Sequence, residues 1–314
     1  MSKRAPVGAV VNEAVQFGLH RWSAVVRAFV APAIVSLFAY VAFVLAIFDL
    51  SSLSETGSAG TPLRFPVGVA VLSFLALLAF LGVVVSGAYA SIYRLAALGE
   101  ERRGWFQIRL DGPAIRVFLS GFVKFAISLV ISAILYAVGV VIDPNGMGEA
   151  LDFWRESVRA VGAMLGGADP DTVSLQIPDE PVYSPGLHAL NALSSLLSIY
   201  MFVKLTPFSP GSAVENRLIP FKSFRMTFGH AWSIFWAYAL LFVFFIIVFV
   251  VGGFAFVVVM GVGGALAAEG AILALVGGAL IFAACLAGLF FAIFTAGAYA
   301  ALSAIIYRRI ETGG

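Results

Sequence analysis

Apolar residues fill six long stretches of the chain, and shorter polar segments separate them. The stretches cover about 28–48, 65–98, 113–141, 187–205, 233–259 and 270–307. A helix needs about 20 apolar residues to cross a hydrocarbon core of about 30 Å. Because hydrocarbon offers the backbone no hydrogen-bond partners, each stretch is predicted to be a membrane-spanning α-helix. The second and sixth stretches are longer than one crossing needs, so they are expected to tilt or to project beyond the bilayer.

Composition and cysteine content agree with this pattern. Apolar residues make up 61% of the chain and charged residues 11%, against roughly a quarter charged in an average soluble domain. The single cysteine, Cys285, lies inside the sixth stretch, which argues against a disulfide framework or a thiol-rich metal site. No small-residue cleavage pattern follows the first stretch, so it is interpreted as a retained helix. The sequence predicts one all-α transmembrane domain over 1–314 with six spans.

The charges outside the spans are unevenly divided between the two sides of this topology. Arg64, Arg155 and Arg159 are the basic residues of one side, and the other basic residues outside the spans fall on the opposite side. The first side also has eleven of the seventeen acidic residues, namely Asp49, Glu55, Asp143, Glu149, Asp152, Glu156, Asp169, Asp171, Asp179, Glu180 and Glu269. By the positive-inside rule, the basic side and both chain termini are expected in the cytoplasm.

Two similar phrases precede the first and the fifth span. "FGLHRWS" occupies 17–23 and "FGHAWS" occupies 228–233. His20 and His230 are each followed 67 positions later by "GAYA", and Tyr-Arg closes each segment. The shared spacing favours a duplication, with repeat units 17–94 and 228–308 in the same orientation.

A central helix pair, 113–205, with an outer loop at 143–185, would then separate the two repeat units. The alternative is a chance match, because Gly, Ala and Phe are abundant in this chain.

The repeated phrases place two histidines and two tryptophans at the predicted cytoplasmic interface. Trp22 and Trp232 can lie at headgroup level, and the residues before each phrase have the spacing of short interfacial helices. We therefore interpret His20, Trp22, His230 and Trp232 as lipid or ligand contacts. A catalytic or metal-binding histidine pair is disfavoured, because His188 falls on the opposite side and no carboxylate–histidine spacing accompanies either phrase.

Two lysines lie inside predicted spans, each in the phrase "FVK". Lys124 and Lys204 belong to the antiparallel third and fourth spans. The pattern predicts that both approach the inner leaflet, where anionic headgroups are plausible ligands. The simpler alternative is that they anchor helix ends at the interface.

The outer segment 143–185 contains a second amphipathic pattern. Its apolar residues step by four and three, at Met147, Leu151, Trp154, Val158, Val161 and Leu165. This predicts a helix that lies on the outer leaflet or caps the bundle. The acidic residues that follow it could gather a cation, but a solvated loop is favoured because the calcium-loop spacing is missing.

Residues 205–235, "LTPFSPGSAVENRLIPFKSFRMTFGHAWSIF", resemble a family of bacterial polytopic inner-membrane proteins. The family is related to the membrane domain that precedes some glycerophosphodiester phosphodiesterases. The resemblance implies a bacterial inner-membrane location and a role for Glu215 and Arg225 in fixing a cytoplasmic elbow. It does not extend to phosphodiesterase activity, because the chain has no such domain.

These observations favour a non-enzymatic integral membrane module that contacts lipid or a protein partner in envelope homeostasis. No catalytic residue, metal ligand, cofactor or nucleic-acid partner is expected, and the oligomeric state is left open. A transporter or channel for a small solute or lipid is the alternative, and it would need a water-filled cavity lined by Lys124, Tyr89, Tyr299 and Asn191. An intramembrane enzyme would need polar side chains that converge near His20 and His230.

Overall fold

A computed structural model describes residues 7–47, 67–101, 108–165, 184–268 and 271–312, and every regular element in these ranges is an α-helix. Six of the helices are long and apolar enough to cross a membrane. The predicted all-α, six-span fold is therefore confirmed, and the chain is a multi-pass integral membrane protein. The predicted turn at Glu269 and the acidic segment after the outer helix lie outside the described residues.

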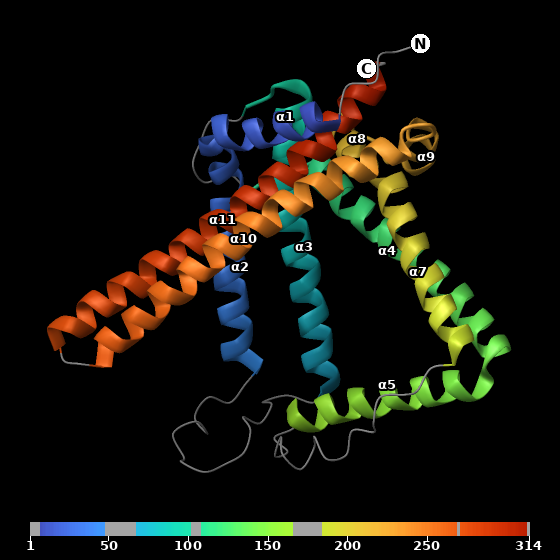
Figure 1. Cartoon of the computed structure of the whole chain (residues 1–314), viewed down its shortest axis with the longest axis horizontal. Helices are drawn as coiled ribbons and strands as arrows, with labels where there is room; N and C mark the ends of the chain where they lie inside the picture. The colour runs from blue at the N-terminus through green and yellow to red at the C-terminus, as the bar shows by residue number, and fades with distance from the viewer. Residues whose placement is uncertain (1–6, 48–66, 102–107, 166–183, 269–270, 313–314) are drawn as a thin grey trace. The chain divides into compact units, whose positions relative to one another are not determined.

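The helices follow one another in the order drawn in Figure 1. They are α1 (Val7–His20), α2 (Trp22–Ile47), α3 (Val67–Leu98), α4 (Gly112–Ile142), α5 (Pro144–Leu165), α7 (Pro185–Leu205), α8 (Phe208–Val214), α9 (Pro220–Met226), α10 (Ala231–Ala268) and α11 (Ala271–Thr312). The helices α1, α9 and the amphipathic α5 are not among the six membrane-crossing segments, whereas the fourth segment, Pro185–Val214, includes both α7 and α8.

The fifth span is longer than the sequence predicted. We expected it to end near Val259, but α10 continues to Ala268, through Gly252, Gly253 and Gly261. Glycine weakens a helix in water by about 1 kcal/mol relative to alanine. In hydrocarbon the backbone has no alternative hydrogen-bond partner, so glycines do not end the helix.

The chain divides into two compact units. Unit 1 comprises Met1–Pro32, Val84–Ser120 and Val203–Gly314, and unit 2 comprises Ala33–Val83 and Gly121–Phe202. The divisions fall inside α2, α3, α4 and α7 rather than between helices. The predicted repeat 228–308 lies within unit 1, whereas 17–94 and 113–205 are each divided between the units.

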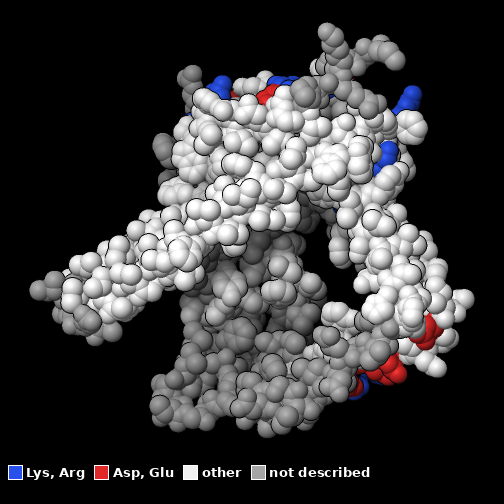
Figure 2. Space-filling model, viewed as in Figure 1, with Lys and Arg blue, Asp and Glu red and all other residues white. Residues whose placement is uncertain are grey.

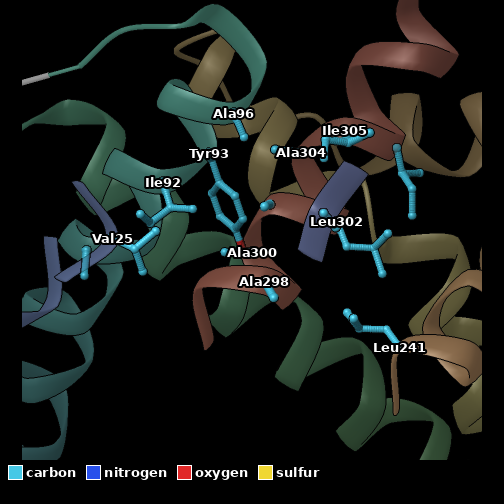
Figure 3. Close-up of a cluster of buried hydrophobic side chains, with 14 of the residues drawn as sticks. Val25, Ile92, Tyr93, Ala96, Leu241, Ala298, Ala300, Leu302, Ala304 and Ile305 are labelled. Carbon is cyan, nitrogen blue, oxygen red and sulfur yellow. The ribbon is translucent and has the colours of Figure 1, made fainter. Parts of the chain in front are cut away.

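Small side chains form much of the core of unit 1 (Figure 3). On α11, Ala298, Ala300 and Ala304 are at most 1% exposed and alternate with larger buried residues such as Leu302. Alanine allows helix backbones to approach closely, which is how helices associate where lipid removes the hydrophobic driving force between them. The core is completed from other helices by Val25, Ile92, Tyr93, Ala96 and Leu241.

The two "GAYA" segments have the same packing role in unit 1. In both, the glycine and the two alanines are buried and the tyrosine is half-buried. Tyr89 meets the ring of Phe29 edge-on at a centroid distance of 5.5 Å, and Tyr299 stacks on Tyr238 at 6.1 Å. Close packing thus explains the motif in both places, and the duplication itself stays a prediction.

A glycine substitution tests this packing. A Cβ on Gly87 would overlap the carbonyl oxygen of Arg109, a backbone atom that no rotamer change can move. Gly87→Ala is therefore expected to destabilise the protein by about 1–3 kcal/mol, as other overpacked cores do. Thermal unfolding in detergent, followed by size-exclusion chromatography, measures the loss.

The matched control is Gly288→Ala in α11, because a Cβ at that glycine would have no heavy atom within 4 Å. This variant is expected to unfold at the wild-type temperature or above it. Equal losses from both variants would contradict the packing that we describe.

Candidate functional site

Unit 1 contains a short buried helix, α8, that begins at a proline and ends at a turn. α7 ends at Leu205, and Pro207 and Pro210 follow; proline lacks the N–H that a helix interior needs but is tolerated in a first turn. α8 is therefore a separate helix from α7, and its residues from Phe208 to Ala213 are all buried. We call residues 206–230, which include α8, α9 and their connecting turns, the elbow.

α8 is fastened to other helices of unit 1 by polar contacts. The Ser120 hydroxyl of α4 donates to the Ser209 hydroxyl at 2.8 Å, and the Arg94 guanidinium of α3 donates to the carbonyl oxygen of Ala213 at 2.9 Å. Gly211 allows the ring of Tyr307 in α11 to approach, because a Cβ there would overlap it. Three helices thus meet at α8.

The residue after the α8 C-cap has a left-handed backbone. Asn216 has φ of 57°, a conformation that asparagine tolerates better than most residues and that commonly ends a helix. Its side-chain oxygen accepts a hydrogen bond from Arg116 of α4. The turn from α8 to α9 is therefore fixed both by its backbone and by a second helix.

Glu215 is the charged centre of the elbow. Its carboxylate accepts hydrogen bonds from Lys222 at 2.5 Å, from Arg217 at 2.8 Å and from the Tyr307 hydroxyl at 2.9 Å. Its side chain is 14% exposed. Burial alone would raise the pKa of this carboxyl, but the three hydrogen bonds and the charge of Lys222 outweigh burial and hold the pKa below its usual value.

Lys222 extends this group to the end of α11. Its ammonium donates to Glu215 and, at 3.0 Å, to Glu311. Burial would lower the pKa of Lys222, but the hydrogen bonds and negative charges of the two carboxylates raise it. The ion pairs therefore join α9 to the α8 terminus and to α11.

All six acidic residues that the predicted topology places on the basic side form ion pairs in unit 1. They are Glu13, Glu100, Glu101, Asp111, Glu215 and Glu311. Their partners are, in the same order, Arg308 and Arg309; Arg94; Arg21 and Arg27; Arg109; Arg217 and Lys222; and Lys222. Figure 2 shows charged side chains along the upper edge of the view, over α1 and α9, and a white visible surface on α10 and α11. Many of the arginines and lysines on this side are thus neutralised by ion pairs within the protein.

The elbow has two different faces at α9. Toward the core, Ser223 and Thr227 are fully buried, and the Ser223 hydroxyl donates to the carbonyl oxygen of Lys204 at 2.8 Å. Away from the core, Phe221 is 87% exposed and Phe228 is 82% exposed, and Arg225 between them is exposed as well. Polar residues thus face inward, and aromatic residues face outward.

The two repeated phrases have different surroundings. Trp22 is half-buried and packs against Phe290 and Phe294 of α11, at centroid distances of 5.7 and 6.2 Å. Trp232 is 70% exposed and lies against Phe235 and Trp236 of its own helix. Only the second tryptophan therefore has most of its ring free for lipid.

The two histidines end and begin helices. His20, the last residue of α1, is exposed, and its Nδ1 donates to the carbonyl oxygen of Gln16 at 2.9 Å. His230 is half-buried, and its carbonyl oxygen accepts from the N–H of Ile234 in the first turn of α10. Within the described residues, no group of three or more His, Cys, Asp or Glu is arranged to hold a metal ion.

Two of the predicted contact residues have surroundings that the sequence did not predict. Lys204 is only 6% exposed, and its ammonium lies 5.5 Å from the centroid of the Phe228 ring. The ring and the elbow cover it, so it does not offer an exposed ammonium to lipid. The side chain of Arg225, which the resemblance implied would fix the elbow with Glu215, is exposed and forms no ion pair or hydrogen bond with any described residue. Of these two residues, Glu215 makes ion pairs that hold the elbow, and a role for Arg225 there stays a prediction.

Lys124 lies elsewhere, on α4 in unit 2, and is half-buried. Since Lys204 belongs to unit 1, the meeting of the two lysines stays a prediction.

Sequence reasoning did not single out Phe221 and Phe228 as site residues. The available signal was the position of Arg225 four residues after one aromatic and three before the other.

A small cavity adjoins the ion pairs of Glu100 and Glu101. It has a volume of about 40 Å³ and is lined by Ala24, Arg27, Ala28, Ser91, Ile92, Leu95, Glu100, Glu101 and Arg109. A cavity needs about 10–15 Å³ for each water, so this one has room for a few water molecules.

Comparison of the chain with protein-family models, curated proteins and solved structures gives no match.

Replacement of Glu215 tests the charged centre. Glu215→Gln is expected to destabilise the protein by about 1.5–3 kcal/mol at neutral pH, because it weakens hydrogen bonds between charged groups. A carboxyl whose pKa is lower in the folded state stabilises the fold above its unfolded pKa, and this stabilisation is lost as the pH falls through the folded value. Wild type should therefore lose stability below its usual pKa of 4.5, and the variant should lose less there.

Thermal unfolding at neutral pH and at about pH 4 separates these effects. Arg225→Gln is the control, because its side chain has no ionic partner among the described residues. It should match wild type at both pH values. A Glu215→Gln protein as stable as wild type at neutral pH would contradict the assigned role.

Proposed function

We propose that this integral membrane protein is a non-enzymatic module that contacts membrane lipid through the outer face of its elbow and serves envelope homeostasis. The observation that carries the proposal is the exposed row Phe221, Arg225 and Phe228, followed by the exposed Trp232. Aromatic rings with a neighbouring cation suit the boundary between acyl chains and headgroups. A guanidinium also binds phosphate through paired hydrogen bonds.

We further propose that the elbow lies at the cytoplasmic surface of a bacterial inner membrane, with both termini on that side. The support is the excess of basic residues on this side of the topology, together with the resemblance of residues 205–235 to bacterial inner-membrane proteins. Anionic phospholipids attract basic groups at such a surface. The outward Arg225 fits this chemistry better than Lys204, whose ammonium is covered.

The transporter alternative has less support. Two of the four residues expected to line a path, Tyr89 and Tyr299, pack against aromatic rings in unit 1. Close packing of alanines in the same core also favours a module without an aqueous channel.

An enzyme is disfavoured because neither of the two repeated histidines forms an ion pair with a carboxylate among the described residues. A protein partner that covers the elbow remains an outcome of the test below.

The test is lipid analysis of the protein extracted with a polymer that keeps its native lipid shell. Wild type is expected to retain several-fold more anionic phospholipid, relative to the bulk membrane, than a Phe221→Ala/Arg225→Gln/Phe228→Ala variant. The matched control is Phe242→Ala, a 57% exposed aromatic inside α10. The control should keep the enrichment, because an acyl-chain contact carries no headgroup preference.

An enrichment that survives the triple substitution would contradict the proposal. A polypeptide that co-purifies with wild type and is lost from the triple variant would replace the lipid with a protein partner. Solute flux into proteoliposomes that depends on Lys124 would favour the transporter instead.

A further inference from the structure

We propose a second membrane contact, which is independent of the elbow. The exposed apolar row of α5, formed by Leu151, Trp154 and Val158, lies in the headgroup region of the bilayer that α4 and α7 enter. Its occupant is the surface of the lipid leaflet itself. The contacts that support this belong to unit 2 alone.

α5 has a continuous apolar row that is exposed among the described residues. Leu151 is 54% exposed, Trp154 is 64% exposed and Val158 is 67% exposed, and the spacing of three and four residues aligns them along one side of the helix. Glu149 and Asp152 point elsewhere around the helix and are exposed too. A helix of this kind is stable beside a membrane surface, where one side meets hydrocarbon and the other meets water.

The corner between α4 and α5 fixes the helix at the end of a span. Only Asp143 separates the two helices, and its carboxylate caps α5 by accepting the N–H of Gly146 at 2.9 Å. Hydrogen bonds from Gly146 and from Ser184, just before α7, lower the pKa of Asp143. α5 thus starts where α4 leaves the hydrocarbon and where α7 enters it.

The same corner shows which way the apolar row points. Met147 precedes Leu151 by one helical turn in the row. Its sulfur lies 2.9 Å from the position that a Cβ of Gly139 would take, in the last turn of α4. Gly139 is nearer the membrane interior than Asp143 along α4, so Met147 points back toward the bilayer, and the residues in line with it do the same.

Charge identifies the kind of lipid surface. The described charged residues of α5 are Glu149, Asp152, Arg155, Glu156 and Arg159, with a net charge of −1 from three acids and two arginines. Glu156 and Arg159 also pair with each other. Attraction to anionic lipid is therefore absent, and burial of apolar area has to provide the binding. We expect the apolar row to bind zwitterionic and anionic bilayers equally well.

A folded protein partner fits this row less well. A stable protein interface buries about 800 Å² on each side, which is more than three side chains in a row supply. Lipid needs no such area, because the two flanking spans already hold α5 at the surface.

Spin labels on the complete protein in lipid nanodiscs test the inference. Cys285 is the only cysteine, so Cys285→Ser provides the background for single labels. Leu151→Cys and Val158→Cys report on the apolar row, and Glu149→Cys and Asp152→Cys are matched controls on the other side. Collision rates with oxygen, which enters lipid, and with a water-soluble nickel chelate are compared.

The labels at 151 and 158 are expected to favour oxygen over the chelate several-fold more than the two controls. The ratios should be unchanged when phosphatidylglycerol replaces part of the phosphatidylcholine. Chelate accessibility at 151 and 158 equal to that of the controls would place the row in water and overturn the proposal. Protection from both reagents would mean that protein covers the row, which overturns it as well. Since all four labels are in unit 2, these outcomes are independent of the elbow variants.

Discussion

The carboxylate of Glu215 is the interaction on which unit 1 depends. A buried charge is stable only when hydrogen bonds replace its lost hydration. Here the replacements come from Lys222 on α9, from Tyr307 on α11 and from Arg217 beside it. Each of these groups must reach one point, and that requirement fixes the direction in which the chain leaves α8.

The charged residues of unit 1 bear on two questions, the orientation of the spans and the binding surface. The excess of arginine and lysine predicts the orientation of the spans in the membrane. The six acidic residues on the same side neutralise many of those cations inside the protein, and they join segments that are distant in sequence. Arg225 is exposed and has no ionic partner among the described residues, so it is more informative about binding than the total charge is.

Much of the architecture follows from the sequence, and several side-chain positions do not. Hydrophobic length determines that six helices cross the membrane, so those elements are predictable. The environment of one residue depends on how its helix is rotated and on what packs there, which is why Lys204 proved buried and Trp22 proved packed on α11. α10 also continues past its predicted end through glycines, which weaken a helix in water but do not end one in hydrocarbon.

The ion pairs between Glu13 and the arginines at 308 and 309 affect how the protein is made. They join residues 295 and 296 positions apart in the chain. A ribosome delivers α1 first, but the surfaces on which α1 packs belong to α10 and α11. The first helix must therefore wait at the membrane surface through nearly the whole of synthesis before it can dock. In this interval the amphipathic helix needs the bilayer or a chaperone to shield its apolar side.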